Sequence, residues 1–194
     1  MSFPAVLTRD DMEALDTREL DLLPLRQKVG ATHGKPLALG GQNLLDALSR
    51  PDRFRILRHG AGGQILARNG LALAEAQHLL RQAYGGVVAF ECPTVHTVMD
   101  RATGKLLVPL MFLRIDAPRA YRLDLLRLLA PCSLKPDATT LERGRIVVRA
   151  ELPLARLIGL ERQVIDRTDG AAHVLCWLAR YGPVSGVAWE GLQA

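Results

Sequence analysis

The stretch Leu106-Leu-Val-Pro-Leu-Met-Phe-Leu-Arg-Ile-Asp116, together with the residues up to Tyr181, decides the fold. Its large and branched apolar residues predict one strand, and its proline places that strand near a sheet edge or gives it an irregular start. Ala117-Pro118 then predicts a turn and a helix start, because proline fixes φ and lacks the N–H that a first helical turn leaves unpaired. From Arg119 to Ala130, apolar and charged residues mix at helical spacing, which predicts a helix with one buried face.

The remainder of this stretch predicts a hairpin, a second helix and a last strand. In chain order the signals are a short strand at 132–135, the turn Arg143-Gly144, the alternating strand Arg145–Leu152, the helix start Pro153–Ile158, the turn Asp169-Gly170 and the strand Ala171–Tyr181. Alternation identifies the strands, and the Gly and Pro residues mark the turns. The predicted order is therefore β-α-β-β-α-β, and we expect Leu113 and Ile115 of its first strand to be buried.

The preceding half of the chain repeats this order, and internal repetition outranks any local motif as an indication of architecture. The corresponding segments are the strand Leu22–Val29, the helix Gly40–Ser49, the hairpin strands Arg53–Leu57 and Gln64–Ala67, the helix Leu71–Tyr84 and the strand Val87–Glu91. The sequence thus predicts an α+β protein with two ferredoxin-like β-α-β-β-α-β modules in tandem, at residues 22–98 and 106–182. An acidic N-terminal segment, residues 1–21, precedes them, and a C-terminal tail, residues 183–194, follows.

Several residues at turns and strand ends recur in an order typical of one family. In the second module they are Leu107-Val-Pro109, Ala117-Pro118, Ala150-Glu-Leu-Pro153, Arg162 and Thr168-Asp-Gly170. Through them the module resembles domain V of elongation factor G and, more closely, of the tetracycline ribosomal protection proteins. The first module resembles domain III of the same factors, through Leu44-Leu-Asp-Ala-Leu48, Pro51-Asp-Arg-Phe-Arg55, Tyr84-Gly85 and Cys92-Pro-Thr-Val95. In that family a further domain lies between the two, whereas here residues 99–105 form only a short linker.

The resemblance implies a non-enzymatic, ribosome-associated or translation-modulating protein. The chain lacks the Gly-x-x-x-x-Gly-Lys-Ser/Thr string that cradles nucleotide phosphates, so we expect it neither to bind nor to hydrolyse GTP. Neither a Ser/His/Asp order nor a paired carboxylate site emerges, and we expect no catalysis and no cofactor. Cys92, Cys132 and Cys176 lack any Cys-x-x-Cys spacing, which predicts reduced thiols and no metal site.

The net charge of +5 lies mostly in the second module, because residues 99–194 carry 14 Lys and Arg against 10 Asp and Glu. A basic module of this fold would bind rRNA through phosphate contacts. The candidates are Arg119, Arg122 and Arg127 on the first helix, Arg143, Arg145 and Arg149 along the hairpin, and Arg167, Thr168 and Gly170 at the last turn. The alternative is a merely solvated polar face. Aromatic residues make up only 5% of the chain, so stacking on single-stranded bases is not expected.

Three functional classes follow from these observations. The first is a protein that binds the ribosome through rRNA or a ribosomal protein. The second is an interaction module that binds a GTPase partner or a second copy of itself, because open sheets of this kind pair through edges or faces. The third is an enzyme on a common fold whose site the sequence does not reveal.

The sequence also predicts the compartment in which the protein is found. No run approaches the roughly 20 apolar residues of a membrane span, and residues 10–21 are acidic where a signal region would be basic. We expect a cytoplasmic protein without a membrane or nucleotide partner.

Overall fold

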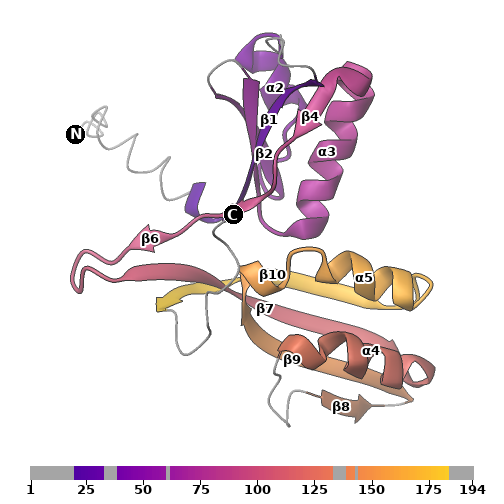
Figure 1. Cartoon of the computed structure of the whole chain (residues 1–194). Coiled ribbons are helices and arrows are strands. Elements are labelled where there is room, and N and C mark those ends of the chain that lie inside the picture. Colours follow the sequence, from indigo (N-terminus) through magenta and orange to yellow (C-terminus); the bar gives the residue numbers. More distant parts are fainter. Residues whose placement is uncertain (1–19, 33–38, 60–61, 133–138, 143, 184–194) are drawn as a thin grey trace, which may run out of the picture. The chain divides into compact units, whose positions relative to one another are not determined.

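The computed structural model describes residues 20–32, 39–59, 62–132, 139–142 and 144–183 (Figure 1). The chain divides into two compact units, of which the first extends to Thr94 and the second starts at Val95. The short segment Asn69–Leu71 belongs to the second unit. Within the described residues, no helix is both long and apolar enough to cross a membrane.

The first unit contains one antiparallel sheet. Its elements are β1 (Leu25–Ala31), α2 (Gln42–Leu48), β2 (Phe54–His59), β3 (Gly62–Ala67), α3 (Gly70–Tyr84), a 3-10 turn (Gly85–Val87), β4 (Val88–Phe90) and β5 (Thr94–Val95). The strand order is β2-β3-β1-β4, with β5 also paired to β1. Both strands of the β2–β3 hairpin lie on one side of β1, and β4 lies on the other side. This is the ferredoxin-like arrangement.

A buried glutamine links the sheet of the first unit to its long helix. Gln27 of β1 is only 4% exposed. Its side-chain oxygen accepts a hydrogen bond from Gln77 Nε2 of α3 at 2.7 Å, and its own Nε2 donates to the Glu91 carbonyl oxygen at 2.6 Å. Because both ends of the amide are satisfied, the polar group is tolerated in an otherwise apolar core.

The second unit repeats the arrangement. Its elements are β6 (Val98–Met99), β7 (Leu106–Pro118), a 3-10 turn (Arg119–Tyr121), α4 (Arg122–Leu129), a 3-10 turn (Ala130–Cys132), β8 (Thr139–Glu142), β9 (Arg145–Pro153), a 3-10 turn (Leu154–Arg156), α5 (Leu160–Arg167) and β10 (His173–Pro183). The strand order is β10-β7-β9-β8, and β6 pairs with the start of β7. The protein is therefore α+β with two ferredoxin-like modules in tandem, as the sequence predicts.

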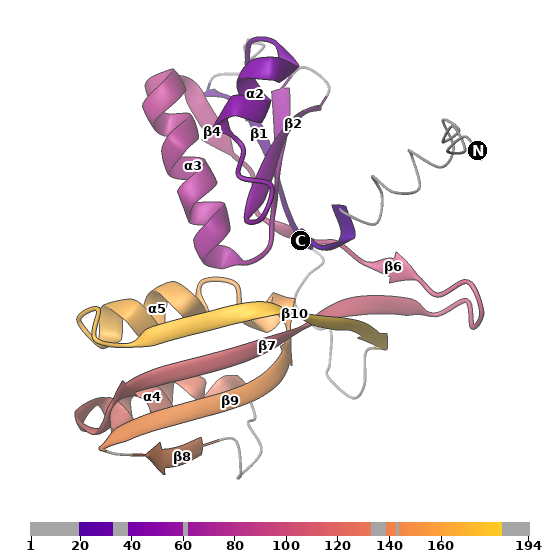
Figure 2. The same cartoon turned by 180° about the vertical axis from the view of Figure 1, so that it is seen from behind.

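The core of the second unit lies between its sheet and its two helices. Alternate residues of β7, from Met111 to Ala117, are completely buried, and among them Leu113 and Ile115 are 0% exposed, which confirms their predicted burial. They lie on the face that also buries Leu125 of α4 and Val164 of α5. Figure 2 shows the opposite face, with β7 and β9 in front of α4.

The position of β7 corrects the prediction of an edge strand, because β7 lies between β10 and β9. The proposed irregular start is the better interpretation. On the side away from β10, the pairing with β6 stops at Leu107 and the pairing with β9 starts at Leu110. Pro109 lies in this gap, where its missing N–H interrupts no ladder on that side.

Most boundaries differ from the sequence prediction by up to three residues, and two in the second module differ by more. Cys132, expected to begin a strand, lies in a 3-10 turn, and the strand that pairs with β9 is Thr139–Glu142. Residues 133–135 lie outside the described residues. The helix expected at Pro153 starts only at Leu160, because Gly159 adopts a φ of +80° and separates α5 from the preceding 3-10 turn.

Candidate nucleic-acid interface

Three connections of the second module meet at one end of its sheet. β7 ends at Pro118, which pairs with Arg145 at the start of β9, and β10 starts beside Asp116. Two hydrogen bonds join the connections themselves. The Arg119 N–H donates to the Gly144 carbonyl oxygen at 3.0 Å, and the Tyr121 hydroxyl lies 3.3 Å from Asp169 Oδ2.

This arrangement brings together some of the predicted RNA contacts. Arg119, Arg122 and Arg167 are exposed. Gly170, in the turn that follows Arg167 and α5, is exposed as well. Among the ion pairs of the described residues, none includes one of these three arginines. We call these four residues the basic end. An arginine without an internal carboxylate partner keeps its N–H groups available for an external anion.

The turn between α5 and β10 is built by its own backbone. Asp169 has a φ of +49° and Gly170 a φ of +77°. The Gly170 N–H donates to the Ile165 carbonyl oxygen at 2.9 Å, which closes the end of the helix. A Cβ added to Gly170 would meet nothing within 4 Å, so the turn presents bare backbone to the outside.

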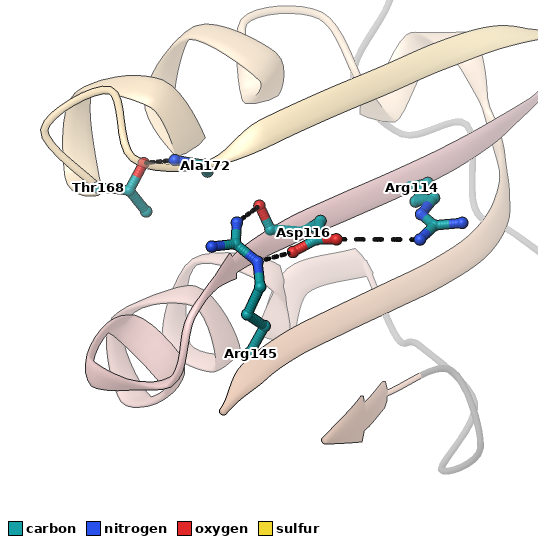
Figure 3. Close-up of polar contacts among 5 residues, drawn as sticks. All are labelled: Arg114, Asp116, Arg145, Thr168 and Ala172. Atoms are coloured by element: carbon teal, nitrogen blue, oxygen red, sulfur yellow. Dashed lines mark hydrogen bonds and ion pairs between the residues drawn. The ribbon is translucent and has the colours of Figure 1, made fainter. Parts of the chain in front are cut away.

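Thr168 lies inside the module. It is 0% exposed, and its hydroxyl donates to the Val164 carbonyl oxygen at 2.8 Å. The Thr168 hydroxyl oxygen in turn accepts the N–H of Ala172 at 3.2 Å (Figure 3). Because the hydroxyl is buried and has internal partners for both roles, we do not retain Thr168 as an RNA contact.

Arg145 is engaged with the module's own sheet. Its Nε donates to the Asp116 carboxylate, and its Nη2 donates to the Asp116 carbonyl oxygen at 3.2 Å (Figure 3). Arg114 Nη2 lies 3.9 Å from the same carboxylate. These contacts fasten the start of β9 to the end of β7, so Arg145 is a poorer phosphate ligand than the arginines of the basic end.

The other candidates are separate from the basic end. Arg127 has a side chain that is 80% exposed and lies 4.0 Å from Asp124, one helical turn away. Arg149 is half-buried in the middle of β9, where it pairs in register with Arg114 of β7. Arg143 lies outside the described residues.

Sequence reasoning missed an aromatic pair on the sheet. Phe112 of β7 and Trp177 of β10 are in register, with ring centroids 4.6 Å apart and an interplanar angle of 32°. Trp177 is 40% exposed and Leu175, two residues before it, is 54% exposed. The low aromatic content pointed away from such a surface, because composition does not tell where aromatic residues gather. The alternation of β10 was the available signal.

Two titratable groups of the second unit have shifted pKa values. The Thr103 hydroxyl and then the Ala102 N–H lower the pKa of Asp100, which lies in the turn between β6 and β7. Burial raises the pKa of the Cys132 thiol, against the opposing influence of Arg156. Cys92, Cys132 and Cys176 are free thiols. In the described part of the chain, no group of His, Cys, Asp and Glu is placed to hold a metal ion.

Comparison with known proteins shows a likeness of fold. No protein-family model and no curated protein matches the chain. The chain is similar in structure to the protein ttk003000868 from Thermus thermophilus, known from a crystal structure, with a TM-score of 0.54 and 15% sequence identity. The match covers 82% of this chain and 40% of that one, so the present chain spans less than half the length of that protein. At this identity the relationship is one of fold.

Proposed function

We propose that the chain is a non-enzymatic, ribosome-associated protein that modulates translation, and that its basic end contacts rRNA in the cytoplasm. The observation that carries the proposal is the Tyr121–Asp169 hydrogen bond, which joins the connection with the exposed Arg119 and Arg122 to the turn after the exposed Arg167, in a module that resembles domain V. Arg119 and Arg122 lie in one connection, and Arg167 lies at the end of α5, far from them in the sequence. Three arginines against the single acid Asp169 leave a positive excess beside a turn that presents bare backbone at Gly170.

The chemistry of this end suits an RNA backbone. Guanidinium groups bind phosphate oxygens with two parallel hydrogen bonds, and helical RNA is recognised mainly through phosphates and 2′-hydroxyls. A glycine at the turn lets an RNA strand approach the backbone closely. Each phosphate neutralised on a duplex contributes roughly 0.9 units to the slope of log K against log salt concentration.

The test is co-sedimentation with ribosomes in sucrose gradients across a range of salt concentrations. We expect the double reversal R119E/R122E to weaken binding and to lower the salt slope by about 1.8 units, if both residues contact phosphates. The matched control is R101E/K105E, which changes charge by the same amount on exposed residues of the turn at the other end of β7. It should leave binding close to that of the wild type.

Two results would contradict this proposal. One is the absence of co-sedimentation at low salt. The other is an equal effect of both double variants, which would indicate a general charge effect and no specific surface. In either case a protein partner, such as a GTPase or a second copy of the chain, becomes the better hypothesis.

The proposal includes the absence of nucleotide chemistry. Because the sequence lacks a phosphate-binding loop, the purified protein should show neither binding nor hydrolysis of GTP. Isothermal titration calorimetry with GTP and Mg²⁺ measures this, and saturable micromolar binding would contradict it.

A further inference from the structure

The second sheet has a face that its helices do not cover, which we call the open face. It consists of the side chains that alternate with the buried ones, including Phe112, Arg114 and Asp116 of β7, Arg149 and Glu151 of β9, and Leu175 and Trp177 of β10. Trp177, Phe112 and Glu151 form one row across three strands, and Leu175, Arg114 and Arg149 form the next. The exposed Trp177 and the half-buried Phe112 therefore lie beside a row that contains two arginines.

The open face carries a positive excess among its described side chains. Both carboxylates are held by arginines: Asp116 by Arg145, and Glu151 by Arg180 Nη2 at 2.5 Å. Arg114 adds a further positive charge, and its Nη2 is 3.9 Å from the Asp116 carboxylate that Arg145 already binds. The charge balance favours an anionic partner.

The apolar part of this face is small. Its accessible members are the exposed Leu175 and Trp177 and the half-buried Phe112, and large aromatic residues bury only about 150–250 Å² each even when fully covered. Because Trp177 is 40% and Leu175 is 54% exposed, the patch falls well below the roughly 800 Å² per partner of a stable protein interface. An exposed tryptophan ring beside an arginine is instead suited to an unpaired base and its phosphate.

We propose that the open face of the second module binds single-stranded RNA, with Trp177, backed by Phe112, stacking on a base and Arg114 binding a phosphate. The surface differs from the basic end. Only the choice of RNA over DNA rests on the proposed function. The stacking itself is argued from the exposed ring of Trp177 and from Arg114 in the neighbouring row.

The test uses the fluorescence of Trp177 in the full chain. The sequence has two tryptophans, and replacing Trp189 by Phe makes Trp177 the only reporter. Titration with an octamer of uridylate at low salt should quench its fluorescence in a saturable way. An abasic octamer with the same phosphates should not quench it, because it offers no ring to stack on. The deoxythymidylate octamer should bind no more tightly than the RNA.

Three variants separate stacking from charge and from fold. Binding by W177F and W177L is measured by fluorescence anisotropy of a labelled octamer. W177F keeps a ring and should bind nearly as the parent, whereas W177L keeps an apolar side chain and should bind roughly 5- to 150-fold more weakly. R114Q should lower the salt slope by about 0.7, the value for one phosphate of a single strand. Circular dichroism and thermal unfolding check that each variant is folded.

The possible outcomes are distinct from those of the ribosome test. Equal binding of W177L and W177F, equal quenching by the abasic octamer, or tighter binding of the deoxy octamer would overturn the inference. Concentration-dependent quenching without RNA, together with dimers in sedimentation velocity, would overturn it in favour of a protein interface. R119E/R122E should retain octamer binding, so loss of ribosome binding in that variant leaves this inference intact.

Discussion

Replacing Thr168 by Val tests whether this residue builds the module or binds RNA. The substitution keeps the β-branched shape and removes the hydroxyl. The Val164 carbonyl oxygen retains a partner, because the backbone N–H of residue 168 donates to it at 3.1 Å. The N–H of Ala172, which is 7% exposed, loses its acceptor at 3.2 Å.

The expected loss of stability follows from this orphaned donor. A buried N–H without an acceptor costs about 1–3 kcal/mol, which sets the expected decrease in the free energy of unfolding for Thr168→Val. Thr168→Ser is the control, because it keeps the hydroxyl and loses one methyl group, worth about 0.8 kcal/mol. The two variants therefore separate the hydrogen bond from the packing.

Two measurements check the reasoning. Denaturant unfolding followed by Trp177 fluorescence in β10 gives the change in stability, and amide hydrogen exchange reports on Ala172 directly. We expect Ala172 to lose protection in Thr168→Val and to keep it in Thr168→Ser. A valine variant as stable as the wild type, with Ala172 still protected, would refute the argument. Reduced ribosome binding by a fully folded valine variant would return Thr168 to the RNA-binding surface.

Two further predictions concern other parts of the chain. Gly62→Ala should destabilise the first unit by about 1–3 kcal/mol in denaturant unfolding, because its Cβ would lie 2.2 Å from a backbone oxygen of β1. Gly30→Ala is the control, since its Cβ would meet nothing within 4 Å, and equal losses in both variants would contradict the prediction. Thr103→Val should raise the lowered pKa of Asp100 toward its ordinary value, as measured by NMR titration. Because the folded pKa lies below the unfolded one, the stability from this contact is present above the ordinary aspartate pKa and is lost as pH falls through the folded value. An unchanged pKa in the valine variant would exclude the hydroxyl as the cause.

Much of the fold is predictable because its signals are local. The alternation in β7 identifies its buried side chains, and repetition of the same order in both halves identifies the architecture. The errors have specific causes. Pro109 predicted an edge strand because proline lacks a backbone N–H donor. The gap along β7 between its pairing with β6 and its pairing with β9 accommodates the proline equally well. The start of α5 was placed too early because Pro153 is a good helix start, whereas Gly159 decides where the helix begins.

The candidate surfaces are less predictable because they depend on register. Sequence reasoning chose arginines by their element, and it grouped Arg145 and Arg149 with Arg119. Only the pairing of β7 with β9 and β10 shows which side chains share a face or an end of the sheet. The same pairing places Phe112 beside Trp177, which are far apart in the chain. A one-residue change of register would move such a pair to the other face, and local sequence does not determine the register.

The residues that carry the family resemblance are largely those that build the fold. Pro109 lies in a gap of the ladder, Thr168 binds the backbone at the end of α5, and Gly170 takes a φ that favours glycine. Such residues recur wherever the same backbone must be formed, whatever the protein binds. The resemblance is therefore strong support for architecture and weak support for ribosome binding. The functions proposed for this chain depend on side chains that the backbone leaves free to vary, chiefly Arg119 and Trp177, so variants at these two positions test them most directly.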